Sequence, residues 1–485
     1  MHRCLRVQEL FSLIFSHLDP MDHSEHHRSY SWRQPTRQDL AVLARTCATF
    51  HGPALHHLWR SSTIANLLHC MPADLWVVDQ ASDSESPNMH PRRPIRAEDW
   101  IRVLVYAPRI RRLCVTSWGC DLSEAFPLIS VCLPDQLLPN LQTLYWWPSS
   151  ANFHFIHLFL GPKITSITFP GSSIHAISLL STLASKYPLL KNVSISCAEE
   201  REVSLFLRSL EFVESVQADI LDRGALEHLS RLPTLTRLSL DTVPTSLSFS
   251  PHLDPKPFAV LRKLQLRSED IEAITHFLGS CKEVPLRSVN LKVQSCPTTA
   301  ESHEFYRALS ASVSHSSLTK VYVDVGLNDI DGNSSYSNLR IHRESIRLLA
   351  GFTNLVTITC INISSPVGID LDDITAADLA RSWPHLEEMH ISSYSEQSAP
   401  PSPPPGTSQH ALKLIDVAHS RISTEIMPVA RFLSAIFPEL KRITTSRDGF
   451  DNRDPEELRS HGEAIAFHDS WKEVELFLVI QEALC

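Results

Sequence analysis

The stretch LPTLTRLSL at residues 232–240 decides the fold, because its pattern of apolar residues returns many times in the chain. After the proline, apolar residues stand at Leu235, Leu238 and Leu240, and polar residues stand between them. The same pattern occurs in PRIRRLCV, PNLQTLYW, PKITSITF, PLLKNVSI and PHLEEMHI, at residues 108–115, 139–146, 162–169, 188–195 and 384–391. A pattern that returns every roughly 20–50 residues indicates a repeat protein.

Twelve repeats can be placed by their first apolar position, and most follow one another at intervals of 22 to 37 residues. These positions are Ile110, Leu141, Ile164, Leu190, Val213, Leu235, Leu261, Leu286, Leu318, Leu355, Leu386 and Leu440. A further, degenerate repeat lies at residues 412–414. Helical patterns stand between the repeats, for example at residues 177–186 and 271–281.

The LxxLxL core with one helix per repeat resembles the leucine-rich repeat. That resemblance implies a horseshoe in which a parallel sheet lines the concave side and helices cover the convex side. We therefore expect an α/β solenoid, an irregular leucine-rich-repeat horseshoe. The asparagine that the family carries three residues after the last apolar position is missing here, so its side-chain ladder is not expected.

Alternation within LxxLxL separates an inner row of side chains from an outer row. The fifth position is never aliphatic, and the charges at the third position are mostly basic. The candidate target-binding residues of the concave face are Tyr145, Arg237, Ser239, Lys263, Gln265, Asn290, Lys320, Tyr322 and His390. Two interpretations stay open: ordinary solvation of a strand face, or a strip centred on Arg237, Lys263 and Lys320 that binds an acidic or phosphorylated segment.

The first sixty residues carry three short helical patterns. Apolar residues at spacings of three and four run from Leu5 to Leu18, a polar loop covers residues 20–38, and two further patterns follow up to Trp59. With the phrase LHCMPADLW at residues 68–76, this opening resembles the F-box-like domain of proteins abundant in mushroom-forming (basidiomycete) fungi. Gln8 stands where that family usually has proline, and the first loop is longer than in the minimal motif.

The resemblance implies a three-helix bundle that binds the Skp adaptor of cullin–RING ubiquitin ligases. The residues that we expect to bind the adaptor are Leu5, Val7, Leu10, Ile14, Phe15, Leu40, Leu43, Phe50, Leu55, Leu58 and Trp59. Many of them must also form the core of the bundle itself. In the alternative interpretation, the helices only cap the repeat array.

Composition shifts divide the chain into segments. An F-box-like three-helix bundle is expected over residues 1–60, a connecting helical segment over 61–78, and a flexible, acidic linker rich in Pro and Ser over 79–95. The repeat array is expected over residues 96–470, with a Pro-rich loop insertion at 392–408, and a C-terminal capping helix over 471–485.

Charge and cysteine content limit the class of protein. The net charge is −10, from 44 basic and 54 acidic residues, which disfavours a nucleic-acid partner or an anionic membrane surface. The eleven cysteines include no CxxC pair, so we expect reduced thiols in a cytoplasmic or nuclear protein. No apolar stretch approaches the roughly 18–20 residues of a membrane helix.

Motifs that carry chemistry are missing from the sequence. It contains no P-loop, GxGxxG, GxSxG or HExxH motif, and we expect no enzyme activity, no cofactor and no metal site. The favoured hypothesis is a substrate receptor of a cullin–RING ligase, with the Skp adaptor on the F-box and a target protein on the array. The alternative is a repeat scaffold for protein partners without a ligase link.

Overall fold

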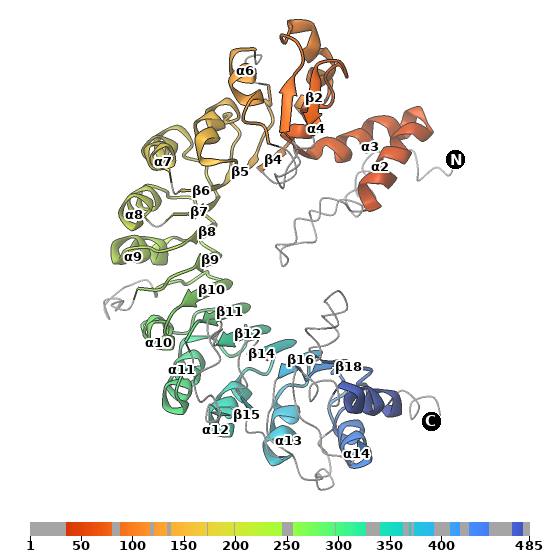
Figure 1. The fold of residues 1–485 in the computed structure, drawn as a ribbon. Coiled ribbons are helices and arrows are strands. Elements are labelled where there is room, and N and C mark those ends of the chain that lie inside the picture. The colour runs from red at the N-terminus through yellow and green to blue at the C-terminus, as the bar shows by residue number, and fades with distance from the viewer. Residues whose placement is uncertain are drawn as a thin grey trace. The chain divides into compact units, whose positions relative to one another are not determined.

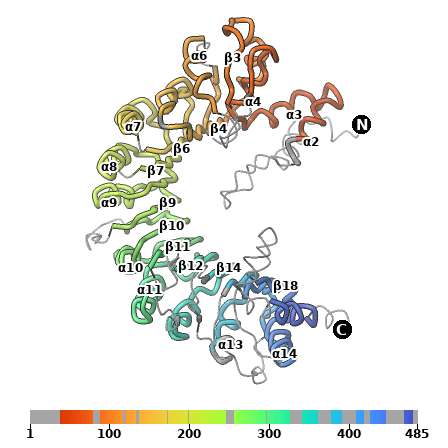
Figure 2. The backbone as a smooth tube through the Cα atoms, viewed as in Figure 1, coloured from red at the N-terminus to blue at the C-terminus, as the bar shows by residue number. Residues whose placement is uncertain are grey.

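A computed structural model gives the fold of most of the chain. It describes residues 35–79, 88–116, 121–132, 137–171, 173–197, 199–244, 256–295, 297–325, 340–361, 368–369, 373–391, 408–417, 426–445 and 468–478. The chain divides into two compact units, Met1–Val213 and Glu214–Cys485. In each unit the backbone repeats the same turn of strand and helix, with the helices that connect successive strands on one side of those strands (Figures 1 and 2).

The first unit opens with a helical hairpin. Helices α2 (Pro35–Thr46) and α3 (Ala48–Arg60) meet at Cys47, whose backbone is extended. Pro35 begins α2, as proline often does because its missing N–H is not needed there. The last four residues of the predicted loop at 20–38 are therefore helical, and residues 20–34 lie outside the described residues.

Five parallel strands follow in the first unit. They are β1 (Ser61–Thr63), β4 (Arg112–Thr116), β5 (Thr143–Trp147), β6 (Ser166–Pro170) and β7 (Asn192–Ser196), hydrogen-bonded in that order. The helices of this unit are α4 (Ile64–Leu68), α5 (Ile101–Tyr106), α6 (Ala125–Cys132), α7 (Ile174–Lys186) and α8 (Glu200–Arg208). Short 3-10 helices cover Ala97–Trp100, Ala107–Arg109 and Ser150–Leu158.

Strand β1 corrects the predicted start of the array. The sequence predicted a helical connection over residues 61–78 and an array from residue 96, but residues 61–63 already pair with β4. Ser62 occupies the core position that Leu113 fills in β4, and it is fully buried. A serine at that position gives no apolar signal, so the LxxLxL pattern could not reveal the strand.

The predicted linker over residues 79–95 is also partly wrong. Strand β2 (Trp76–Asp79) pairs antiparallel with β3 (Asn88–Pro91), and Met89 is fully buried. The guanidinium of Arg93 donates two hydrogen bonds of 2.8 Å to the Asp99 carboxylate and one of 2.8 Å to Asp74. These contacts fix the second half of a segment that composition alone marked as flexible.

The described residues of the second unit form nine parallel strands, each hydrogen-bonded to the next in chain order. They are β8 (Ser215–Ala218), β9 (Arg237–Leu240), β10 (Lys263–Ser268), β11 (Ser288–Val293), β12 (Lys320–Val325), β14 (Thr357–Ile361), β16 (Glu388–Ile391), β17 (Leu414–Asp416) and β18 (Arg442–Thr444). The helices are α9 (Arg223–Arg231), α10 (Ile271–Gly279), α11 (Thr299–Ser312), α12 (Arg343–Arg347), α13 (Asp373–Ser382) and α14 (Ile426–Ile436). A 3-10 helix covers Leu348–Gly351, and β13 (Arg340–Ile341) pairs with β15 (Gly368–Ile369) outside the main sheet.

Burial follows the predicted alternation. In β10, Leu264 and Leu266 are buried, whereas Lys263, Gln265 and Arg267 are half-buried on the other face. The proline that opens a repeat stands two residues beyond the end of a helix at residues 188, 233, 384 and 438, where a residue without an N–H cannot continue the helix. The expected fold class is confirmed: the chain is an α/β solenoid of leucine-rich-repeat type.

A backbone contact ties neighbouring repeats together within each unit. The carbonyl of Thr236 accepts the N–H of Arg262 at 2.8 Å and that of Lys263 at 3.0 Å. The carbonyl of Arg262 in turn accepts the N–H of Arg287 at 2.7 Å and that of Ser288 at 3.0 Å. The same double contact is made by the carbonyls of Arg111, Gln142, Thr165, Glu214, Arg287, Thr319, Val356, Glu387 and Lys413. This contact needs no particular side chain and stands in for the missing asparagine.

A helix covers the last described strand of the second unit. Residues 468–478 are helical, and a capping helix was predicted over residues 471–485; Trp471, Val474 and Leu478 are buried. The ammonium of Lys472 donates to the carbonyl of Ile443 in β18 at 2.9 Å. Residues 479–485 and most of the predicted Pro-rich insertion at 392–408 lie outside the described residues.

Gly171 supplies a test of repeat packing in the first unit. Its N–H donates to Ser196 at 2.6 Å, and an added Cβ would overlap Cys197 and lie 2.8 Å from its Sγ. We expect Gly171→Ala to lower the free energy of unfolding by about 1–3 kcal/mol, as overpacking does. Chemical denaturation measures this change.

Gly279 is the matched control, because a Cβ added there meets no atom within 4 Å at the end of α10. Gly279→Ala should leave stability unchanged or raise it by about 0.4–1 kcal/mol. Equal denaturation midpoints for the two variants would contradict the packing described at Gly171.

Candidate binding surface

Four neighbouring strands of the second unit bring twelve outward-facing side chains together. The third-position row of β9 to β12 holds Arg237, Lys263, Ser288 and Lys320, and the fifth-position row holds Ser239, Gln265, Asn290 and Tyr322. The same register continues to a seventh-position row, which holds Arg267, Lys292 and Asp324, and Asp241 directly follows β9 at the same position of its repeat. We name these twelve residues the β9–β12 patch.

The β9–β12 patch is positively charged within an acidic chain. Five of its side chains are cationic: Arg237, Lys263, Arg267, Lys292 and Lys320. Two are carboxylates, Asp241 and Asp324, whereas the chain as a whole carries a net charge of −10. Neighbouring strands lie about 4.8 Å apart, so these charges reinforce one another and favour an anionic group.

Most of the predicted target-binding residues meet in this patch. The structure brings together Arg237, Ser239, Lys263, Gln265, Asn290, Lys320 and Tyr322. His390 lies in the fifth-position row on β16, beyond β14, and its Nδ1 is 3.2 Å from the carboxylate of Asp416. Tyr145 lies on β5 of the first unit and is not part of the patch.

The seventh-position row was missed in the sequence. The LxxLxL pattern ends at the sixth residue, whereas β10, β11 and β12 each continue beyond it. Arg267, Lys292 and Asp324 are the next outward residues, and all three are charged. Extending the period-two alternation by one step in KLQLRS, SVNLKV and KVYVDV would have found them.

Asp324 is a buried carboxylate at the edge of the patch. It is 1% exposed, Tyr322 donates its hydroxyl to Oδ2 at 3.3 Å, and Oδ1 has no hydrogen-bond partner. Burial raises the pKa of Asp324, while Lys292, Tyr322 and Arg267 oppose that rise. Burial, with the charge of Asp324, also raises the pKa of Tyr322 to about 12, and the Lys292 ammonium lies 5.6 Å from the Tyr322 ring centre.

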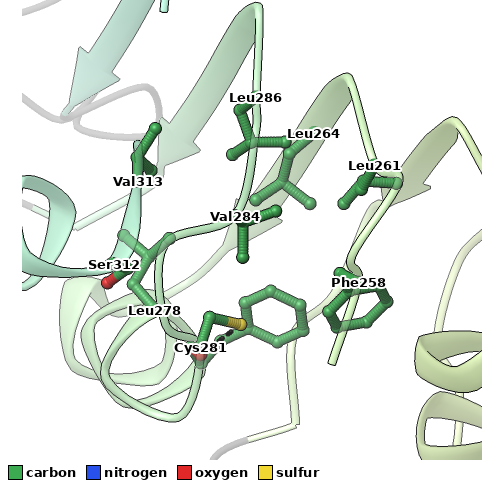
Figure 3. A pocket seen from close by; sticks show the side chains of 10 residues that line it. Phe258, Leu261, Leu264, Leu278, Cys281, Val284, Leu286, Ser312 and Val313 are labelled. Carbon is green, nitrogen blue, oxygen red and sulfur yellow. Dashed lines mark hydrogen bonds between the residues drawn. The ribbon is translucent and has the colours of Figure 1, made fainter. Parts of the chain in front are cut away.

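The apolar cavity in the same unit is too small to hold a ligand. It has a volume of about 10 Å³ and lies between α10 and the inner face of β10 and β11, where Leu264, Val284 and Cys281 point into it (Figure 3). A volume of this size corresponds to about one water molecule. The cavity is therefore a gap in the packing of the repeat core.

Cysteine, metal and membrane chemistry find little support among the described residues. Burial raises the pKa of Cys114 and of Cys281 to about 12 and that of Cys360 to about 11, which disfavours the reactive thiolate. Over the described ranges, no group of three His, Cys, Asp or Glu side chains could hold a metal ion. In the same part of the chain, every helix is too short or too polar to cross a membrane.

The helical hairpin places the predicted adaptor-binding residues differently. Leu40 is 1% exposed and forms the hairpin core with Ala44 and Ala54, so its predicted contact with an adaptor is wrong. The partly buried residues Leu43, Phe50, Leu55 and Leu58 pack against that core. Leu5, Val7, Leu10, Ile14 and Phe15 lie outside the described residues.

Trp59, one of the predicted adaptor-binding residues, contacts another residue of the first unit. Its ring stacks on that of Tyr106 in α5, with the ring centres 4.5 Å apart and the planes 12° from parallel. Val42 on α2 is 55% exposed and is a surface residue that the sequence did not single out. Its neighbour Leu43 is only partly exposed and packs against the hairpin core.

These features define the class: a leucine-rich-repeat-type solenoid with a helical hairpin before the sheet and a charged patch on the strand face opposite the helices. Among solved structures, it is similar to a chain from the crystal structure of the Rad7 and Elc1 complex in yeast. The two are 13% identical, with 91% of this chain and 94% of that chain covered and a TM-score of 0.39.

Two further solved structures are similar. A chain of the TLR13–ssRNA13 complex is 14% identical, with 70% of this chain and 47% of that chain covered and a TM-score of 0.34. A chain of the Toll–Spatzle complex of Drosophila is 9% identical, with 76% of this chain and 46% of that chain covered and a TM-score of 0.32. This chain spans about half the length of those two chains. No family model and no curated protein matches the sequence. At these TM-scores, the likeness does not extend to function.

The buried carboxylate of Asp324 gives a test of the patch electrostatics. The pKa of Asp324 is higher in the folded than in the unfolded chain. The contribution of its protonated form to the free energy of unfolding is therefore fully present below the unfolded pKa and is lost as the pH rises through the folded pKa. The Asp324→Asn side chain cannot ionise, and we expect this variant to have a higher free energy of unfolding than the unaltered chain at pH 7. The gain should shrink as the pH falls toward 4.

Asp378→Asn is the control, because Asp378 on α13 is 40% exposed and pairs with Arg347 and Arg381. Its effect should stay within about 0.5 kcal/mol. A loss of stability at neutral pH in Asp324→Asn would show that the carboxylate is well paired in the folded chain.

Proposed function

We propose that this chain is the substrate receptor of a cullin–RING ubiquitin ligase. The hairpin of α2 and α3, together with the helix predicted over residues 5–18, binds the Skp adaptor, and the β9–β12 patch holds the target protein. The observation that carries the target-binding part is the patch itself: five cations in adjacent register on four strands of a chain with net charge −10.

The adaptor-binding part rests on the F-box-like residues and on the construction of the hairpin. Among the described residues, its core is formed by Leu40, Ala44 and Ala54, with four partly buried apolar side chains packed at its margin. A helical pair gains stability when a partner covers such an apolar margin. Leu43, Phe50, Leu55 and Leu58 are the described residues available for such a contact.

In this proposal the chain performs no bond-making step. It raises the effective concentration of the target near the ubiquitin-transferring subunits, and those subunits supply the chemistry. The place proposed for the chain is the cytoplasm or nucleus, where reduced thiols such as those of Cys47, Cys70, Cys114, Cys132, Cys281 and Cys360 persist. The partners are a Skp-type adaptor, the cullin–RING assembly reached through it, and a target protein that is acidic or phosphorylated.

A repeat scaffold without a ligase link is the second candidate. The same patch would then hold a protein partner, and the hairpin would serve only to cover the first strand of the array. The stacking of Trp59 on Tyr106 favours this reading for the C-terminal end of α3, because it ties that end to the repeats. Adaptor binding separates the two functions.

The full chain is expected to form a stable complex with a Skp adaptor when the two are co-expressed and separated by size-exclusion chromatography. Leu43→Ala and Leu55→Ala should each weaken the complex by about tenfold or more, because they remove apolar contact area from the hairpin margin. Isothermal titration calorimetry with purified proteins measures the change.

Val131→Ala is the matched control, since Val131 on α6 is apolar and 84% exposed. It should bind the adaptor as the unaltered chain does. A full chain that unfolds cooperatively, yet elutes apart from the adaptor, would remove the ligase assignment and leave the scaffold.

A further inference from the structure

Buried polar atoms without partners gather in the β9–β12 patch. Ser239 Oγ, Arg267 Nε, Asn290 Oδ1 and Asp324 Oδ1 are enclosed by neighbouring atoms and make no hydrogen bond. These four atoms come from four consecutive strands and all lie on the outward rows. Unpartnered buried atoms are rare in folded proteins and are costly, so four of them in one place indicate a surface that is completed by a ligand.

The four atoms define the hydrogen bonds that the ligand must make. Asn290 Oδ1 and Asp324 Oδ1 can only accept, Arg267 Nε can only donate, and the Ser239 hydroxyl can do either. The ligand must therefore offer both donors and acceptors over a distance of about three strand spacings, or roughly 14 Å. An extended peptide offers N–H and C=O groups in alternation and covers that distance with about four residues.

The charges of the patch decide what the peptide must carry. Arg267 on β10 and Lys292 on β11 stand side by side in the seventh-position row, and Lys263 on β10 and Lys320 on β12 stand in the third-position row. Lys320 is exposed, and Lys292 leans over the ring of Tyr322. An anionic side chain placed between Arg267 and Lys292 would bond both cations, and charge-assisted bonds of this kind are the strong ones.

We propose that the β9–β12 patch binds an extended peptide segment with an anionic side chain. Peptide N–H groups donate to Asn290 and Asp324, a peptide carbonyl accepts from Arg267 Nε, and the anionic group bonds the cations of Arg267 and Lys292. This inference rests on the proposed function only in that the segment belongs to the target protein. Carboxylate and phosphoryl groups share the required chemistry, and the experiment below distinguishes them.

A single-stranded nucleic acid fits the patch less well. Its backbone presents phosphate oxygens, which accept hydrogen bonds and cannot satisfy Asn290 Oδ1 or Asp324 Oδ1. The carboxylates of Asp241 and Asp324 also oppose a continuous chain of phosphates across the four strands. Tyr322 is the one aromatic side chain among the twelve residues, so the patch offers little stacking for bases.

The test uses the full chain and synthetic peptide libraries. Four fluorescein-labelled decapeptide libraries are random except for one central residue, which is glutamate, phosphoserine, glutamine or lysine. Fluorescence anisotropy should show at least tenfold tighter binding to the glutamate or the phosphoserine library than to the glutamine library, and the weakest binding to lysine. A preference between the first two identifies the anionic group.

Two variants connect the binding to the patch. Arg267→Gln should remove the preference for the anionic libraries. Asp324→Asn should weaken binding at least fivefold while its melting temperature stays equal to or above that of the unaltered chain. Arg307→Gln is the matched control, because Arg307 lies on α11 beside Glu304, away from the strand face, and should bind like the unaltered chain.

Three outcomes would overturn the proposal: equal binding to all libraries, equal effects of Arg267→Gln and Arg307→Gln, or tighter binding of a random single-stranded oligonucleotide than of any library. The result is separate from the test of the ligase assignment. A chain that selects anionic peptides but ignores the Skp adaptor keeps this site and loses the ligase role, and the reverse result loses only this site.

Discussion

The structure depends on one backbone contact, the carbonyl that accepts two N–H groups from the following repeat. At Thr236 the two bonds measure 2.8 and 3.0 Å, and the contact returns from Arg111 to Lys413. Because only main-chain atoms take part, each repeat can hold its neighbour without a dedicated side chain. The apolar residues at the first, fourth and sixth positions then need only to fill the core.

Because main-chain atoms and core residues hold the repeats together, the side chains at the outward positions are not needed for that contact. In β9 to β12 they carry five cations and four buried polar atoms without partners, a composition that does nothing for the stability of the sheet. Asp324 shows the conflict most clearly, since a carboxylate that is 1% exposed weakens the fold that holds it. Natural sequences keep such groups where binding needs them.

The sequence allowed most of the array to be predicted, because Leu235, Leu238, Leu240 and their equivalents combine an apolar period with a proline that ends a helix. It could not reveal β1, whose core residue is Ser62, or β3, which is held by Met89 and by the pairing of Arg93 with Asp99. The outward rows were found as far as the fifth position. The burial of Leu40 and the unpartnered polar atoms of the β9–β12 patch depend on tertiary packing, which a local sequence pattern cannot predict.

The central claim is that one chain carries two separate protein-binding surfaces, a helical hairpin for an adaptor and a strand face for an anionic peptide. Hydrogen–deuterium exchange on the full chain tests it most directly, with the Skp adaptor and the preferred peptide library added in turn. We expect slower exchange within residues 35–60 on addition of the adaptor and within residues 237–241, 263–268, 288–293 and 320–325 on addition of the peptides. Unchanged exchange in those strands, with protection by the peptides elsewhere in the chain, would contradict it.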